Sequence, residues 1–196
     1  RSFYNLHATE DGDMTVFDVN GDEKLDLIIS SGGYQYETGD TSYQNRLYIG
    51  NGLGMFGLVK NALPIEGFNS GKILRKDIDL DGDEDVIVFG AGDPMNYPTA
   101  GTSKIYLNEN GFYRDATEEI APEIERIGMV NDAVFSDFDK DGDQDIVIVG
   151  EWMNITFLEN SQGKFSLKST ELKIPGWWSA IEVADIDGDG DDDYLV

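Results

Sequence analysis

The chain of 196 residues contains no cysteine. This excludes a disulfide framework, a thiol nucleophile and a thiolate metal site. The one histidine, His7, has no evident partner, so we expect a solvated side chain and not a catalytic base. The motifs G-x-S-x-G and H-E-x-x-H are missing, and no apolar run reaches the roughly 18 residues of a membrane span. We therefore expect a protein that has no membrane span and is not an enzyme.

Basic residues are scarce, since 14 Lys and Arg stand against 39 Asp and Glu and give a net charge of −25. This balance argues against a nucleic acid partner, because phosphates would be repelled and no basic stripe opposes the repulsion. The acidic residues are concentrated, with 21 of the 39 in four segments of nine residues: 18–26, 77–85, 137–145 and 185–193. The acidity therefore marks local sites more than the whole surface.

These four segments, called here the first to fourth acidic loops, repeat one pattern. They read D-V-N-G-D-E-K-L-D, D-I-D-L-D-G-D-E-D, D-F-D-K-D-G-D-Q-D and D-I-D-G-D-G-D-D-D. Oxygen ligands at positions 1, 3 and 5, a sharp turn near position 6, a backbone carbonyl at 7 and a carboxylate at 9 suit a hard cation that prefers six to eight oxygens. The pattern predicts up to four bound Ca²⁺ ions.

The loops start 59, 60 and 48 residues apart, a spacing typical of propellers and other repeat arrays. A short strand precedes each loop, and the run after it is too apolar to have one face in water. A third strand follows, and then an Asn/Gly turn leads to a fourth that begins at Phe56, Phe112 or Phe165. Each repeat therefore predicts four antiparallel strands.

We predict an all-β fold, a β-propeller of four-stranded antiparallel blades, within one domain over residues 1–196. About three and a half blades are expected, at residues 13–62, 71–118, 129–172 and, in part, 178–196. Because the chain begins at Arg1 without Met, we expect a segment of a longer protein. The missing blades would come from the rest of that protein or from a second copy.

The pattern D-x-[DN]-x-D-G-x-x-D before an apolar strand resembles the FG-GAP or VCBS repeats of bacterial secreted proteins and of the integrin α-chain propeller. Phe89-Gly90 and Ala91-Gly92 echo the motif that gives the family its name. The resemblance covers nearly the whole chain. It implies a calcium-loaded propeller that acts in adhesion or ligand recognition, or that forms an accessory domain beside a catalytic one.

The resemblance also implies the metal ligands. The side-chain ligands would be Asp18, Asn20, Asp22 and Asp26; Asp77, Asp79, Asp81 and Asp85; Asp137, Asp139, Asp141 and Asp145; and Asp185, Asp187, Asp189 and Asp193. The backbone carbonyls would come from Lys24, Asp83, Asp143 and Asp191, whose side chains are expected to face water. The first loop departs from the pattern, with Glu23 in place of the turn glycine and neutral Asn20 at position 3, so we expect it to bind calcium less tightly.

Aromatic residues gather in or beside the longest connections, residues 31–44 and 90–102, which a propeller would place on the face opposite the acidic loops. The candidate ligand-binding residues are Tyr34, Tyr36, Tyr97, Trp152, Trp177 and Trp178. Exposed aromatics suit stacking on sugar rings or a protein hot spot. They can equally pack over the core between the blades or line the channel mouth.

The sequence thus predicts a calcium-binding β-propeller module for recognition or adhesion, with a protein or glycan ligand. An extracellular, periplasmic or cell-surface location follows from the millimolar calcium found there. Two alternatives stay open: the scaffold of a polysaccharide lyase or other secreted carbohydrate-active enzyme, and a purely structural repeat of a surface protein. Scarce His, Lys and Arg weigh against the lyase, although Arg46, Tyr43 and Tyr97 are available to it.

The end of the chain suggests self-association. It stops at Val196, within the second strand of the fourth repeat. This leaves an apolar face, formed by Ile181, Val183, Tyr194 and Leu195, without a following blade. Open strand edges and exposed apolar surface favour association, so we expect it here unless residues 2–6 supply a covering strand.

Overall fold

The computed structural model describes residues 10–170 and 173–196. The expectations for His7 and for residues 2–6 concern positions outside these ranges. Within them, no helix has the length and apolar character that a membrane crossing requires.

The described residues form four antiparallel sheets in chain order, which confirms the predicted all-β class. The first sheet contains β1 (Glu10–Phe17), β2 (Asp26–Gly32), β3 (Arg46–Gly50) and β4 (Phe56–Val59). The second contains β5 (Ser70–Lys76), β6 (Asp85–Gly90), β7 (Lys104–Asn108) and β8 (Tyr113–Asp115). The third contains β9 (Met129–Ser136), β10 (Asp145–Asn154), β11 (Thr156–Ser161), β12 (Lys164–Leu167) and β13 (Pro175–Trp177). The fourth contains β14 (Glu182–Ala184) and β15 (Asp193–Leu195).

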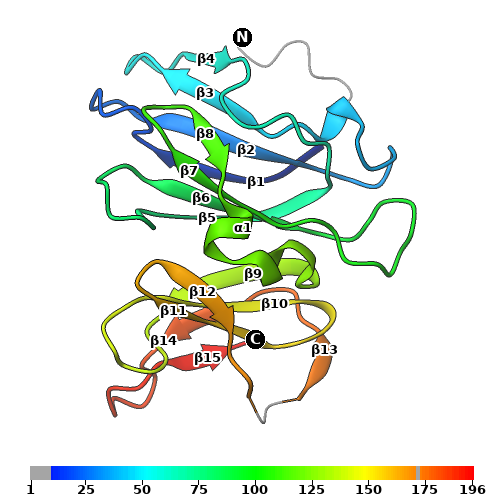
Figure 1. Cartoon of the computed structure of the whole chain (residues 1–196), viewed down its shortest axis with the longest axis vertical. Helices are drawn as coiled ribbons and strands as arrows, with labels where there is room; N and C mark the ends of the chain where they lie inside the picture. Colours follow the sequence, from blue (N-terminus) through cyan, green and yellow to red (C-terminus); the bar gives the residue numbers. More distant parts are fainter. Residues whose placement is uncertain (1–9, 171–172) are drawn as a thin grey trace.

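The sheets lie one above another along the long axis, with the first at the top and the fourth at the bottom (Figure 1). In the first three sheets the first four strands pair in sequence as antiparallel neighbours. The short helices are η1 (Thr41–Tyr43), α1 (Thr117–Ile120) and η2 (Pro122–Arg126). The sequence did not predict these helices, although Ile120 and Ile124 insert into the core shared by the second and third sheets.

Strand β13 is another feature that the repeat pattern did not predict. Strand β10 is longer than β2 and β6, and its end pairs with both β9 and β13. The register of the β13 pairing shifts between Glu151 and Met153. Residues 175–177, which lie before the expected start of the fourth repeat, therefore extend the third sheet.

The core lies between the sheets, and the second strand of each full repeat faces two cores at once. In β6, Val86 and Val88 belong to the cluster shared with the first sheet. Ile87 and Phe89 belong to the cluster shared with the third. Successive residues of a strand point to opposite faces, so a continuous apolar run is what a strand buried on both faces requires. This confirms the prediction for these strands.

The fourth sheet is less open than the sequence suggested. Ile181 is buried with Val147 and Val149, and Tyr194 packs edge-on against Phe157 of the third sheet. These residues face the preceding sheet, so the prediction that they form an uncovered face was wrong for Ile181 and Tyr194. Leu195 is exposed, and self-association stays a prediction.

Replacing Ile87 by Ala should lower the free energy of unfolding by about 3 kcal/mol, because the side chain is fully buried between two sheets and its removal leaves a cavity. Equilibrium denaturation in urea would measure the change. Leu53→Ala is the matched control, since Leu53 is 86% exposed and should change stability by less than about 0.5 kcal/mol. Equal losses in the two variants would contradict this account of the core.

Candidate metal centres

Each acidic loop joins the first two strands of its sheet, and all four loops lie on one side of the stack (Figure 1, left). The first strand ends where the acidic residues begin. The second begins at the last carboxylate of the loop, at Asp26, Asp85, Asp145 or Asp193. The sheet thus fixes both ends of every loop.

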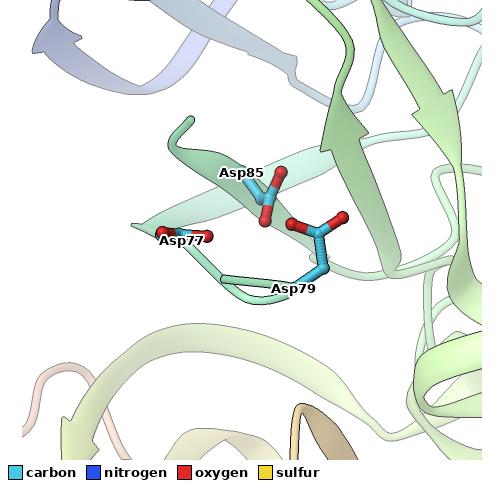
Figure 2. A group of neighbouring side chains, drawn as sticks. All are labelled: Asp77, Asp79 and Asp85. Atoms are coloured by element: carbon cyan, nitrogen blue, oxygen red, sulfur yellow. The ribbon is translucent and has the colours of Figure 1, made fainter. Parts of the chain in front are cut away.

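Three of the four loops bring the carboxylates of positions 1, 3 and 9 together. In the second loop Asp77, Asp79 and Asp85 each offer an oxygen, and these oxygens lie within 4.8 Å of one another (Figure 2). The other two groups are Asp137, Asp139 and Asp145, and Asp185, Asp187 and Asp193. In the first loop Asn20 replaces the middle carboxylate, and Asp18 and Asp26 hold the outer positions.

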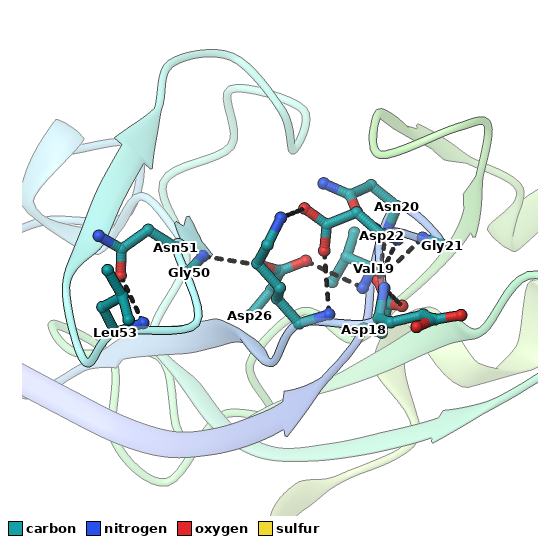
Figure 3. A network of polar contacts seen from close by, with 11 residues as sticks. Asp18, Val19, Asn20, Gly21, Asp22, Asp26, Gly50, Asn51 and Leu53 are labelled. Atoms are coloured by element: carbon teal, nitrogen blue, oxygen red, sulfur yellow. Dashed lines mark hydrogen bonds and ion pairs between the residues drawn. The ribbon is translucent and has the colours of Figure 1, made fainter.

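The first carboxylate of a loop organises the turn by accepting backbone hydrogen bonds. Asp18 Oδ1 accepts from the N–H of Gly21 at 2.8 Å, and its Oδ2 accepts from the N–H of Glu23 at 2.6 Å. Figure 3 shows this folded loop, in which the backbone curls around the carboxylates. In the second loop Asp77 Oδ2 likewise accepts from Gly82 N–H at 3.1 Å. The bonds hold the loop closed around its acidic groups.

Position 5 lies outside the three groups. Oδ1 of Asp81, Asp141 and Asp189 accepts the N–H of position 7, each at 2.9 Å. In the first loop the equivalent Asp22 also pairs with Lys24 Nζ at 2.8 Å. The structure therefore gathers positions 1, 3 and 9 and leaves position 5 at their edge.

The side chains at position 7 differ among the loops. That of Lys24 turns back to Asp22, Asp191 pairs with Lys140, and Asp143 accepts a hydrogen bond from Gln162 N–H at 3.4 Å. The side chain of Asp83, in the second loop, is half-buried. None of these side chains belongs to the three carboxylate groups.

The backbone turns at two positions of each loop, of which the sequence identified one. Position 6 has a positive φ in every loop, at Glu23 (64°), Gly82, Gly142 and Gly190. Position 4 does too, at Gly21, Leu80 (62°), Lys140 and Gly188. Side chains other than glycine are strained in this region. In the first loop the glycine stands at position 4 and not at position 6, so its one strained residue is Glu23. The second and third loops also have one strained residue each, Leu80 and Lys140.

The last carboxylate of each full repeat is buried and ties the loop to the sheet. Asp85 Oδ2 accepts from Ile78 N–H at 2.8 Å, and its Oδ1 accepts from Asn108 N–H at 2.8 Å, at the end of β7. Asp26 makes the same pair of bonds to Val19 and Gly50, and Asp145 makes them to Phe138 and Asn160. All three residues are 0% exposed. The position therefore has a structural role as well as a place in the candidate site.

Asn108 and Asn160 were missed by the sequence analysis, although both supply more than a backbone N–H. Asn108 Nδ2 donates to the carbonyl of Val19 in the first loop at 2.9 Å, and so links two neighbouring repeats. Each Oδ1 accepts from the glycine three residues on, Gly111 or Gly163. The spacing N-x-x-G at the end of the third strand is the signal that could have identified them.

The electrostatics of the loops favour a bound cation. Burial raises the pKa of Asp85 to about 6 and also raises the pKa of Asp145. Burial raises the pKa of Asp79, and the charges of Asp81 and Asp77 act in the same direction. Oδ1 of Asp137 is buried without a hydrogen-bond partner among the described residues. Clustered oxygens, one of them unpaired, fit a divalent cation with hard oxygen ligands.

The six candidate ligand-binding aromatics occupy different environments. Tyr97, Trp152 and Trp177 gather in one exposed cluster: Trp152 Nε1 donates to Tyr97 Oη at 2.7 Å, and the two indole centroids are 5.2 Å apart. Tyr34 accepts a hydrogen bond from Gly92 N–H, and Tyr36 packs edge-on against buried Tyr43. Trp178 packs against the core of the third and fourth sheets.

Replacing Leu80 by Gly should stabilise the metal-free protein by about 1 kcal/mol, because Leu80 is strained at a φ of 62° and its side chain is 83% exposed. Thermal unfolding in calcium-free buffer would measure the gain. Gly82→Ala is the opposite control, since it adds a side chain at a φ of 101° and should destabilise. A loss of stability in Leu80→Gly would show that φ strain at position 4 is unimportant.

The raised pKa of Asp85 predicts a pH dependence of the metal-free protein. A carboxyl whose folded pKa lies above its ordinary value stabilises the fold at low pH, and this contribution is lost as the pH rises through about 6. Calcium-free protein should therefore melt at a higher temperature at pH 5 than at pH 8. In Asp85→Asn this dependence should be reduced, and an equal pH slope in both proteins would contradict the assignment.

A search of curated proteins finds no match. Among solved structures, a rhamnogalacturonan lyase of family PL11 from Bacillus licheniformis aligns with a TM-score of 0.49 and 16% identity. The alignment covers 95% of this chain and 40% of that one, so the chain spans less than half the length of the lyase.

The family comparison is more specific. The model of the FG-GAP-like repeat matches residues 18–88, 77–148 and 137–196. Each match begins at an acidic loop. The second loop lies in both the first and the second match, and the third loop lies in both the second and the third match. Together the three matches span all four loops and reach the last residue of the chain. This chain belongs to the FG-GAP-like repeat family.

Proposed function

We propose that the chain is part of a calcium-loaded β-propeller that acts outside the cytosol as a recognition or adhesion module. The observation that carries the proposal is the repeated carboxylate group: three loops bring positions 1, 3 and 9 within 4.8 Å on one side of the stack. Like charges held this close repel unless a cation screens them. Calcium is the ion whose ligand number and flexible geometry suit such loops.

The ions would be structural. Each candidate site lies between the first two strands of a sheet, and in the three full repeats its buried last carboxylate also accepts a hydrogen bond from the end of the third strand. A bound ion would therefore fix the loop and the strand ends together. We propose full occupancy where calcium is millimolar, with the first loop weakest because Asn20 supplies a neutral oxygen.

The opposite side of the stack is the proposed recognition surface. The connections from β2 to β3 and from β6 to β7 project on the right of Figure 1, away from the acidic loops. Exposed aromatics, Tyr34, Tyr97, Trp152 and Trp177, lie in or beside connections on that side. Because the acidic loops would hold metal ions, we expect the ligand to contact this opposite surface. We propose that the module binds its partner there without catalysing a reaction.

Removal of calcium should lower the melting temperature markedly, because a ligand at 100 times its dissociation constant stabilises by about 2.7 kcal/mol per site. Asp79→Asn should weaken one calcium-binding event in calorimetric titration, since it removes a charge from the carboxylate group of the second loop and leaves a neutral oxygen there, as Asn20 does in the first loop. Asp83→Asn is the matched control, two positions before the last ligand and outside that group, and should keep all binding events.

A protein without bound metal would contradict the proposal. If metal analysis shows an ion-free protein whose melting curve is the same in excess chelator and in millimolar calcium, the loops are acidic turns without a metal. A further result against it would be equal loss of binding in Asp79→Asn and Asp83→Asn, because the carboxylate group would then have no special place in the site.

A further inference from the structure

We propose that Tyr97, Trp152, Trp177 and Glu151 form a binding platform for a glycan that carries free amino groups, such as glucosamine units. The proposal rests on the recognition role proposed above and specifies its ligand. The platform draws on separate parts of the fold: Tyr97 comes from the β6–β7 connection, Glu151 and Trp152 from β10, and Trp177 from β13.

The aromatic rings of the platform face solvent although they are held in place. Trp152 is 61% exposed and Trp177 is 58% exposed, with centroids 5.2 Å apart and planes inclined by 60°. Tyr97 is also exposed and joins them through the hydrogen bond from Trp152 Nε1. Large apolar rings exposed together on a monomer mark an interaction surface. The flat C–H face of a pyranose ring matches such indole faces in size and polarity.

Backbone strain supports a functional role for Trp152. Its φ is 57°, in the left-handed region that favours glycine, and it lies at the register shift between Glu151 and Met153. A bulky residue persists in this conformation only where the surrounding structure or its function requires it. Here the strain directs an indole toward solvent, so packing of the core does not account for it.

The hydrogen bonds within the platform show which of its polar groups stay available to a ligand. Trp152 Nε1 donates to Tyr97 Oη at 2.7 Å, and the Tyr97 hydroxyl donates to Glu151 Oε2 at 3.0 Å. These two donors are therefore already used. In the part of the chain that the structure describes, the Glu151 carboxylate receives no other side-chain hydrogen bond and pairs with no Lys or Arg.

The platform thus offers π faces and a carboxylate that no Lys or Arg of the described residues neutralises. Both attract a cation, and the net charge of −25 strengthens the attraction at long range. The same groups disfavour a glycan of uronic acids, which would place carboxylates against Glu151. A sugar ring that carries an ammonium group uses both properties at once.

The test uses the full chain in millimolar calcium and two probes with one backbone, a glucosamine tetramer and the N-acetylglucosamine tetramer. Binding is followed by tryptophan fluorescence and calorimetry at low and physiological salt. We expect the glucosamine tetramer to bind at least about tenfold more tightly, and the difference to shrink as salt rises. Glu151→Gln should remove most of this difference.

Two variants separate binding from folding. Trp152→Gly removes the indole and relaxes the positive φ, so it should abolish binding while the melting temperature stays the same or rises. Phe112→Ala is the control, because Phe112 is an exposed aromatic, 58% accessible, in the turn between β7 and β8, and should bind as the unmodified chain does.

Several results would overturn the proposal. Equal binding of the two tetramers would show a sugar surface without charge selection, and equal binding of an oligolysine peptide would show a cation site without sugar selection. No binding of the glucosamine tetramer at millimolar concentration would remove the site altogether. Calcium titration of the same samples tests the other part of the proposed function separately, because calcium binding concerns the acidic loops on the opposite side of the stack.

Discussion

The buried carboxylate at the end of the first three acidic loops is the group on which the loops and the sheets of this structure depend. Asp26, Asp85 and Asp145 each accept one N–H from the loop and one from the end of the third strand. A carboxylate without exposure to water must be neutralised or fully bonded. Two backbone bonds satisfy part of this requirement, and the neighbouring carboxylates of the loop leave a place for a cation to satisfy the rest.

This arrangement makes the loops part of the sheets. The second strands are buried on both faces, so their first residue cannot shift without moving two cores. The loop carboxylates are therefore held close together by the fold itself, which would lower the entropic cost of binding an ion at the proposed sites. The same closeness raises the free energy of the metal-free protein through repulsion, so calcium binding at the proposed sites would be coupled to folding.

The two sides of the stack have different chemistry. On the acidic side, repeated turns present oxygen atoms at nearly the same geometry in each sheet, because the strands on both sides of each turn are repeated. On the other side, the connections differ in length and content, and Tyr97 meets Trp152 only because the second and third sheets are stacked. Tyr97 lies in the β6–β7 connection and Trp152 in β10, 55 residues apart in sequence. A repeated fold thus combines similar acidic turns on one side with connections that differ from repeat to repeat on the other.

The sequence by itself determined the strand order within each repeat, the burial of the second strands on both faces and the residues of the acidic loops. These features are local, since they depend on periodicity and on ligand spacing within nine residues. Only the tertiary structure decided which loop carboxylates gather, because the direction of Asp81 depends on a backbone bond at position 7 and not on its spacing. The positive φ at Leu80 and Lys140 could not be predicted from the sequence either, because Leu and Lys rarely adopt this conformation.

The helical segment with buried Ile120 and Ile124, the added strand β13, the covering of Ile181 by the third sheet and the joining of Tyr97 to Trp152 also depended on tertiary structure. Each brings together residues from different repeats or fills a space between sheets, and no period within one repeat encodes such a contact.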